Sequence, residues 1–161
     1  MRLLSLAAML SATQAAMALP EDADQPIHIR ADNAEIDQQA ERVVYRGAVQ
    51  VDQGTLRVTA DKMIVEYKNE KVVRIIATGT PAHYRQRIEA DAAEVLADAT
   101  TIIYYTQEER LDLKGNAHLD QQGSSIDGDY IRYDIVAGKI DATTEGDGPV
   151  RMTLQPATRE N

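Results

Sequence analysis

The chain contains no cysteine, no tryptophan and no phenylalanine. Without cysteine it can form neither disulfide bonds nor thiolate metal sites, and thiol catalysis is excluded. Seven tyrosines are the only aromatic side chains that could stack against bases or sugar rings. The sequence therefore lacks the residue types on which several classes of enzyme and of nucleic-acid-binding protein depend.

Positive charge is also scarce. The chain carries 17 lysines and arginines against 26 aspartates and glutamates, for a net charge of −9. A nucleic-acid-binding protein needs a basic footprint, so we expect no nucleic-acid partner. After the N-terminal segment there is no apolar run long enough to span a bilayer.

The N-terminal segment has the three parts of a secretory signal peptide. Arg2 supplies the positive start, residues 3–10 form a short apolar segment, and residues 16–18 (Ala-Met-Ala) form a small-residue cleavage site. A retained membrane anchor is the alternative, but Ser11 and Thr13 interrupt the apolar segment. We expect cleavage after residue 18 and location in the periplasm.

The remaining chain has the length of one domain and needs no disulfides to bury a core. We expect a signal peptide over residues 1–18, a flexible leader over 19–25, one domain over 26–154 and a frayed tail over 155–161.

Two short elements recur along this domain. One is a β-branched residue, any residue, a small residue and then Asp, at 29–32, 58–61, 88–91 and 126–129. The other is centred on glycine, and a gapless alignment superimposes residues 47–61 on 115–129. Repetition at the period of the fold favours structural corner residues, with Asp accepting local backbone N–H groups. These predicted turn residues are Asp32, Asp61, Asp91, Asp129, Gly47, Gly79 and Gly115. The functional alternative is a row of carboxylates for acid–base chemistry or Ca²⁺.

Between these elements, apolar and polar residues alternate with a period of two, which predicts half-buried β-strands. We expect an all-β protein of about fifteen short strands, a spacing typical of sandwiches, jelly rolls and β-solenoids. Only residues 90–99 are rich enough in alanine for a helix. Because Asp91 belongs to the strand repeat, we interpret that segment as a strand running into a loop.

The apolar positions of these strands define one predicted inner face. Its members are Ile27, Ile29, Val43, Tyr45, Val49, Val51, Leu56, Val58, Tyr84, Ile88, Ile102, Tyr104, Leu111, Leu113, Leu119, Ile126, Ile131 and Tyr133. Two interpretations are open. The face is either an ordinary core or an apolar trough between two sheets that takes acyl chains.

Catalytic and metal sites find little support. The three histidines, at positions 28, 83 and 118, lack metal-ligand spacing, and no Gly-x-Ser-x-Gly elbow is present. We therefore expect no catalytic residue, no metal and no cofactor, and interpret the chain as a binder or carrier and not an enzyme.

Several linked motifs carry a family resemblance over residues 25–154. They are Pro26-Ile27-His28-Ile29, Tyr45-Arg46-Gly47-Ala48-Val49, Gln53-Gly54, Ala60-Asp61-Lys62, Gly115-Asn116-Ala117 and Gly128-Asp129-Tyr130-Ile131. In this order, and after a signal peptide, they resemble the OstA-like family of periplasmic lipopolysaccharide-transport proteins. The resemblance implies an open, twisted antiparallel β-jellyroll that binds the acyl chains of lipid A along its apolar interior.

The resemblance also implies partners. Members join head to tail into a bridge from the inner to the outer membrane. The bridge begins at an inner-membrane transport complex with an LptC-like subunit and ends at an outer-membrane translocon with an LptD-like subunit. The ends of an open sheet have unpaired backbone groups that invite strand addition. The predicted oligomer edges are Ile27, His28, Ile29, Arg30, Val150, Arg151, Met152, Thr153 and Leu154.

Two other functions stay open at this point. A periplasmic polysaccharide-binding or -cleaving β-module would need a pair of carboxylates converging in a cleft and aromatic platforms for sugar rings. A purely structural assembly module would bind no lipid.

Overall fold

A single β-sheet makes up almost all of the ordered protein in the computed structural model, which describes residues 22–87 and 94–156. The predicted signal peptide, residues 19–21 of the predicted leader, Ile88, Asp91 and residues 157–161 of the predicted tail lie outside these residues. In the described part, no helix has the length and apolar character needed to cross a membrane.

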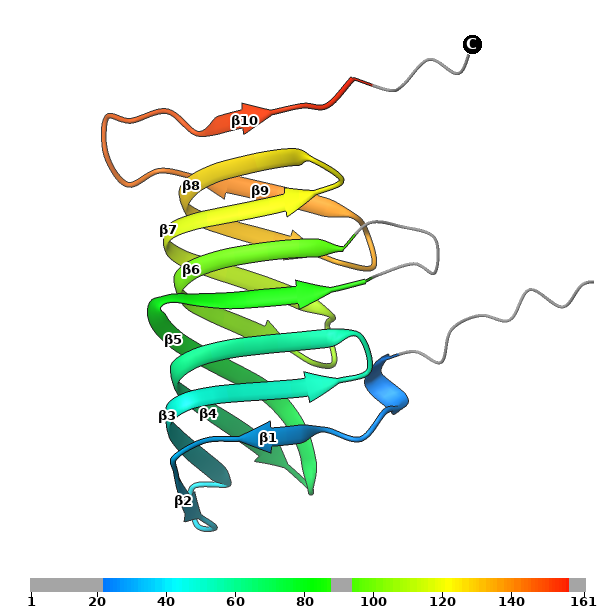
Figure 1. Ribbon diagram of the computed structural model, residues 1–161, viewed down its shortest axis with the longest axis vertical. Coiled ribbons are helices and arrows are strands. Elements are labelled where there is room, and N and C mark those ends of the chain that lie inside the picture. Colours follow the sequence, from blue (N-terminus) through cyan, green and yellow to red (C-terminus); the bar gives the residue numbers. More distant parts are fainter. Residues whose placement is uncertain (1–21, 88–93, 157–161) are drawn as a thin grey trace, which may run out of the picture.

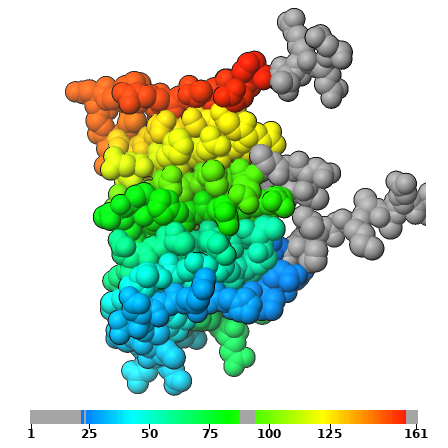
Figure 2. Space-filling view, in the orientation of Figure 1, coloured from blue at the N-terminus to red at the C-terminus, as the bar shows by residue number. Residues whose placement is uncertain are grey.

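Ten antiparallel strands follow a short 3-10 turn, η1 (Asp22–Asp24). The strands are β1 (His28–Arg30), β2 (Asn33–Asp37), β3 (Arg42–Gln53), β4 (Leu56–Lys68), β5 (Lys71–Gln86), β6 (Val95–Tyr105), β7 (Arg110–Gln121), β8 (Ser124–Asp134), β9 (Lys139–Thr143) and β10 (Arg151–Thr153). The all-β, antiparallel, open fold expected from the sequence is confirmed. Figures 1 and 2 show the strands stacked along the long axis, from the N-terminal strands at one end to β10 at the other.

The expected number of about fifteen short strands is wrong, because the central strands are long and bent. Strands β3 to β8 are 11 to 16 residues long, and each crosses from one half of the sheet to the other without ending. The interpretation of residues 90–99 is also wrong in part. Residues 95–99 belong to β6 and do not form a loop.

The bend lies along a crease where the pairing register shifts. Shifts occur between Arg46 and Val49 in β3 and recur in each following pair of strands up to β7 and β8. Extra residues of this kind let a strand turn while its ladder of hydrogen bonds resumes on the other side. Gly47 has a φ of +81°, and a Cβ there would lie 2.2 Å from a carboxylate oxygen of Asp32, so only glycine fits.

The crease divides the molecule into two half-sheets. The β1/β10 half-sheet runs from β1 through one arm of each central strand to β10, and the β2/β9 half-sheet runs from β2 to β9. Figure 1 shows the two half-sheets facing each other, with their hairpin turns on the side away from the crease. Because the sheet does not close, β1 and β2 are left as edges at one end, and β9 and β10 at the other.

Three of the predicted corner aspartates, Asp32, Asp61 and Asp129, lie along this crease, but with different contacts. The backbone N–H of Asp32 donates to the Gly47 carbonyl at 3.0 Å. Asp129 accepts a hydrogen bond from the backbone N–H of Glu145 at 2.8 Å. Asp61 is exposed at the register shift of β4, and its side chain has no hydrogen bond within the described residues.

These contacts predict unequal effects for two matched substitutions. Asp129→Ala should lower the free energy of unfolding by about 1 kcal/mol, because the Glu145 N–H loses its acceptor. Asp61→Ala should stay within about 0.5 kcal/mol of wild type, since its side chain is exposed. Urea unfolding of the three proteins measures the difference. Equal losses for the two variants would contradict the assignment.

Candidate functional site

Two unbroken rows of side chains run the whole length of the inner face. The strand registers place one row on the β1/β10 half-sheet: Ile29, Val51, Val58, Tyr84, Ala97, Leu119, Ile126 and Met152. The other, on the β2/β9 half-sheet, is Ile36, Val43, Val65, Ile75, Tyr104, Leu111, Tyr133 and Ile140. Every member is apolar or tyrosine, so an apolar surface runs without interruption from one end of the interior to the other.

Burial along these rows is greatest in the middle and least at the ends. Inside the rows, Val51, Val65 and Leu111 are at most 1% exposed. At the two ends, Ile36 is 70% exposed and Met152 is 56% exposed. The interior is therefore a packed core at its centre and an accessible apolar surface at its ends.

At the C-terminal end residues of both half-sheets line an open pocket of about 560 Å³. Its apolar lining comes from both half-sheets and the last strand: Leu119, Ile126, Ile140, Met152 and Leu154. The rest of the lining is mostly polar: Gln121, Gln122, Ser124, Ser125, Gln155 and Pro156. The pocket thus offers apolar contacts together with hydrogen-bonding groups, as ligand sites do.

The structure brings the predicted inner-face residues together. All of them except Ile27, Ile29 and Tyr45, which are partly buried, and Ile88, which is not described, are buried. Sequence reasoning missed further inner residues, namely Met63, Val65, Ile75, Ala77, Ala82, Val95, Ala97, Ala99 and Ala117. The alternation could have identified Met63 and Val65 in β4. It could not identify the alanines, whose occurrence says little about burial.

The leader is anchored at the open side of the β1/β10 half-sheet. The Asp22 carboxylate accepts hydrogen bonds from the backbone N–H and the hydroxyl of Thr55 at 2.7 and 2.6 Å, and from the Gln86 amide at 2.6 Å. The Gln25 carbonyl accepts another from the Gln53 amide at 3.1 Å. These contacts place residues 22–25 across the hairpin tips of β3 to β5. The sequence offered no local signal for this anchoring.

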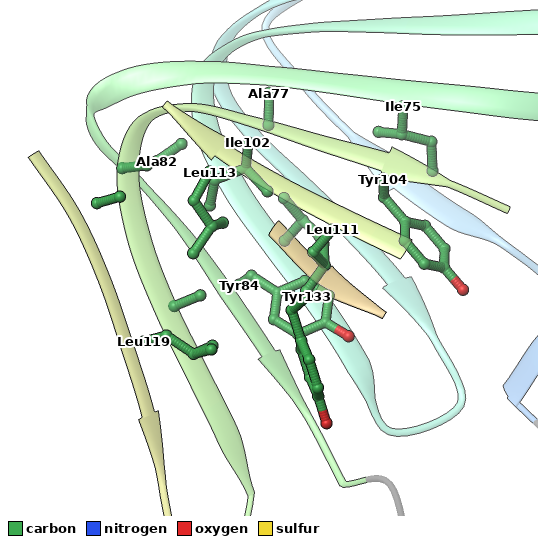
Figure 3. Close-up of a cluster of buried hydrophobic side chains, with 14 of the residues drawn as sticks. Ile75, Ala77, Ala82, Tyr84, Ile102, Tyr104, Leu111, Leu113, Leu119 and Tyr133 are labelled. Atoms are coloured by element: carbon green, nitrogen blue, oxygen red, sulfur yellow. The ribbon is translucent and has the colours of Figure 1, made fainter. Parts of the chain in front are cut away.

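Three tyrosines project between the half-sheets. Figure 3 shows Tyr84, Tyr104 and Tyr133 with their rings directed away from the crease residues Ala77 and Ala82. Burial raises the pKa of Tyr84 well above its ordinary value, and the nearby Tyr104 and Tyr133 raise it further. Burial also raises the pKa of Tyr104 to about 12.

The outer face has a different character. On it, His83 pairs with Asp98, and His118 pairs with Asp127 at 2.7 Å. Within residues 22–87 and 94–156, no three histidine or carboxylate side chains lie close enough together to share a metal ion.

Comparison with known proteins identifies close relatives. A family described as "LptA/(LptD N-terminal domain) LPS transport protein" matches residues 28–139. The lipopolysaccharide export system protein LptH of Pseudomonas aeruginosa is 35% identical, over 88% of this chain and 85% of that protein. The export system protein LptA of Escherichia coli K12 is 33% identical, over 98% of this chain and 85% of that protein.

A solved structure shows the same fold. It is the crystal structure of LptH, entitled the LptA-homologous periplasmic component of the conserved lipopolysaccharide transport device of P. aeruginosa. It matches this structure with a TM-score of 0.78 at 31% identity, covering 85% of this chain and 100% of that chain.

The buried hydroxyls predict loss of stability at alkaline pH. The Tyr104 pKa is raised from 10.0 to about 12, so above pH 10 the folded state retains a proton that the unfolded chain loses. The stabilisation from Tyr104 is complete below about pH 10. It is lost as the pH rises toward 12, by about 2–3 kcal/mol. Urea unfolding across this pH range should show a smaller loss for Tyr104→Phe. Tyr105→Phe, on the outer face, should keep the full loss, and identical behaviour of the two variants would contradict the assignment.

Proposed function

Because this chain belongs to the LptA/(LptD N-terminal domain) family of lipopolysaccharide transport proteins, we propose that it is a periplasmic carrier that binds lipopolysaccharide through the lipid A acyl chains. The resemblance noted in the sequence is confirmed by these relatives. The family's description as transport proteins agrees with the expectation of a carrier and not an enzyme.

The two unbroken inner rows are the observation that carries this proposal. They extend from the β1 and β2 edges to the β9 and β10 edges with no charged side chain among their members. Each CH₂ group of an acyl chain that leaves water for such a surface contributes about 0.8 kcal/mol. An acyl chain lying along the rows thus has a continuous apolar path.

The open side of the fold explains how the charged part of the ligand is accommodated. The half-sheets are joined at the crease and carry separate hairpin turns on the opposite side (Figure 1). Acyl chains entering between the hairpin tips would leave the sugar and phosphate groups in water. A net charge of −9 is then compatible with an anionic ligand, because the protein does not have to enclose its phosphates.

The packed centre requires that the half-sheets separate when acyl chains enter. The crease suits this movement, because the register shifts interrupt the ladder along a line crossing all the central strands. The C-terminal pocket of about 560 Å³ gives a place where entry begins without such separation.

The ends of the sheet support head-to-tail assembly. Large apolar side chains that are more than a third exposed are concentrated there in the described residues: Ile36 in β2, Val136 between β8 and β9, and Val150, Met152 and Leu154 around β10, with Leu96 as the exception. The two ends are different surfaces, so pairing one with the other is heterologous and produces an open filament. In this filament the inner rows of successive copies would be continuous.

The partners in this proposal are lipopolysaccharide, further copies of the chain and the two membrane complexes that the bridge connects. These complexes are the inner-membrane transport complex with its LptC-like subunit and the outer-membrane translocon with its LptD-like subunit. Each would continue one free end of the sheet.

The polysaccharide-cleaving alternative loses its structural basis. The two inner rows contain no carboxylate. The buried Asp112 lies on the outer face, where its carboxylate is 3.3 Å from the guanidinium nitrogens of Arg110 and Arg132. Its surroundings are those of a structural ion pair.

Photo-crosslinking tests the lipid path. A photoreactive residue at an inner position should capture lipopolysaccharide, and one at a neighbouring outer position should capture little. The inner positions are Ile29, Tyr45, Tyr104 and Leu119, and the outer controls are His28, Gln50 and His118. Equal capture from both faces would refute the proposal that acyl chains lie between the half-sheets.

Truncation tests the assembly. Deleting residues 149–161 removes β10 and its exposed apolar side chains, so it should give a monomer. Deleting only residues 157–161 leaves β10 intact and should preserve concentration-dependent oligomers. Light scattering over a range of protein concentrations distinguishes the two. Long oligomers from the larger truncation would exclude β10 as the joint and leave the β9 edge.

A further inference from the structure

The aromatic residues of the inner face all carry a hydroxyl group. The chain has seven tyrosines and no phenylalanine or tryptophan, and five tyrosines are inner residues: Tyr45, Tyr67, Tyr84, Tyr104 and Tyr133. If the interior needed only aromatic volume, phenylalanine would supply it without the cost of removing a hydroxyl from water. This cost suggests that the hydroxyl groups have a function separate from filling the interior.

Three of these tyrosines occupy equivalent places in their strands. Tyr84, Tyr104 and Tyr133 each stand within two residues of the end of their strand, which is Gln86 in β5, Tyr105 in β6 and Asp134 in β8. The rings therefore begin in the apolar rows, and the hydroxyls lie toward the open side. Figure 3 shows the three hydroxyl oxygens on the side of the rings that faces away from the crease.

The hydroxyls differ in their partners. The Tyr84 hydroxyl donates to the side-chain oxygen of Gln86, whose amide in turn donates to Asp22 at 2.6 Å. Tyr45 and Tyr67 interact with each other, which together with burial raises the pKa of Tyr45. Tyr104 is 9% exposed, and its hydroxyl has no hydrogen bond to any residue within the described ranges.

The Tyr104 hydroxyl is therefore able to donate a hydrogen bond to a ligand, and it lies at the boundary between the apolar rows and water. Its neighbours in the row are the apolar Ile75 and Leu111. Its pKa of about 12 keeps the hydroxyl protonated, and hence a donor, throughout the neutral range. A ligand that accepts this hydrogen bond needs an acceptor atom at the end of the apolar chain that lies along the rows.

An acyl chain attached to a sugar presents that group. Its ester or amide linkage has a carbonyl oxygen, a hydrogen-bond acceptor, at the junction of the apolar chain and the polar head. Entry of the chain between the half-sheets would bring this carbonyl to the level of the open side, where it loses part of its hydration and gains from a protein donor.

We propose that Tyr104, grouped with Tyr84 and Tyr133, donates a hydrogen bond to the carbonyl of an acyl linkage and so sets how deeply each chain enters between the half-sheets. This subsite rests on the proposed binding of acyl chains and adds a polar determinant to an otherwise apolar interior. It makes the protein selective for acyl over alkyl chains of the same length.

The test compares isosteric variants and matched ligands. Tyr104→Phe keeps the ring and removes only the hydroxyl. Tyr105→Phe makes the same change at the next residue of β6, on the outer face, and serves as control. The ligands are lipopolysaccharide, sucrose monododecanoate and dodecyl maltoside. The two detergents, used below their micellar concentrations, share a twelve-carbon chain and a disaccharide head, but only the first has a carbonyl.

Tyr104→Phe should weaken binding of lipopolysaccharide and of sucrose monododecanoate by about fivefold, the worth of one neutral hydrogen bond. It should leave dodecyl maltoside binding unchanged, and Tyr105→Phe should bind all three as wild type does. Thermal unfolding at neutral pH establishes that both variants are folded.

The possible failures separate this inference from the proposed function. If wild type binds no lipopolysaccharide, the proposed function itself is wrong, and the inference with it. If wild type binds lipopolysaccharide but Tyr104→Phe binds it equally well, only the carbonyl contact is refuted. The contact is likewise refuted if wild type takes up the two detergents equally, or takes up neither.

Discussion

A sheet that folds over on itself without closing must leave both ends of its hydrogen-bond ladder unpaired, and most features of this protein depend on that constraint. Closure into a barrel would satisfy β1, β2, β9 and β10 and seal the interior. The open fold instead combines a buried centre with ends whose backbone N–H and C=O groups are unpaired. The same geometry that leaves backbone donors and acceptors free at the ends also brings the apolar rows to the surface there, so the proposed assembly and the proposed ligand transfer would share one structural origin.

The crease is the second element of this design. Each central strand bends at the crease, where the register shifts, and its pairing continues on the other side, so six long strands serve both half-sheets. Small side chains line the inside of the bend, where Gly79 is buried and a Cβ on it would lie 2.9 Å from the Ala82 nitrogen. Bulky residues further along each arm then fill the space between the half-sheets. The interior is therefore narrow at the crease and wider toward the hairpin tips.

Alternation with a period of two was sufficient to predict the fold class and most of the inner face, because each strand has one apolar and one polar side. It could not predict the length of the strands. Gly47 and Gly115 mark turns in the sequence equally well whether a strand ends there or bulges and continues. Nor could it predict the anchoring of the leader. Asp22 contacts Thr55 and Gln86, which are 33 and 64 residues away, and no local pattern encodes such contacts.

The internal repeat and the anchored leader together show how the two ends of the molecule differ. The alignment of residues 47–61 with 115–129 places Gln53 and Gln121 at equivalent positions, each at the end of an arm of the β1/β10 half-sheet. Gln53 donates to the Gln25 carbonyl of the leader, whereas Gln121 lines the C-terminal pocket. The two equivalent sites thus have different occupants: residues 22–25 at the first, and at the second Gln155, whose backbone N–H donates to the Ser124 hydroxyl at 3.1 Å. A molecule built from near-repeats would otherwise present similar ends, and the leader makes the N-terminal and C-terminal halves of the open side distinct. In the proposed carrier, two ends that differ in this way would allow lipopolysaccharide to be loaded at one end and released at the other.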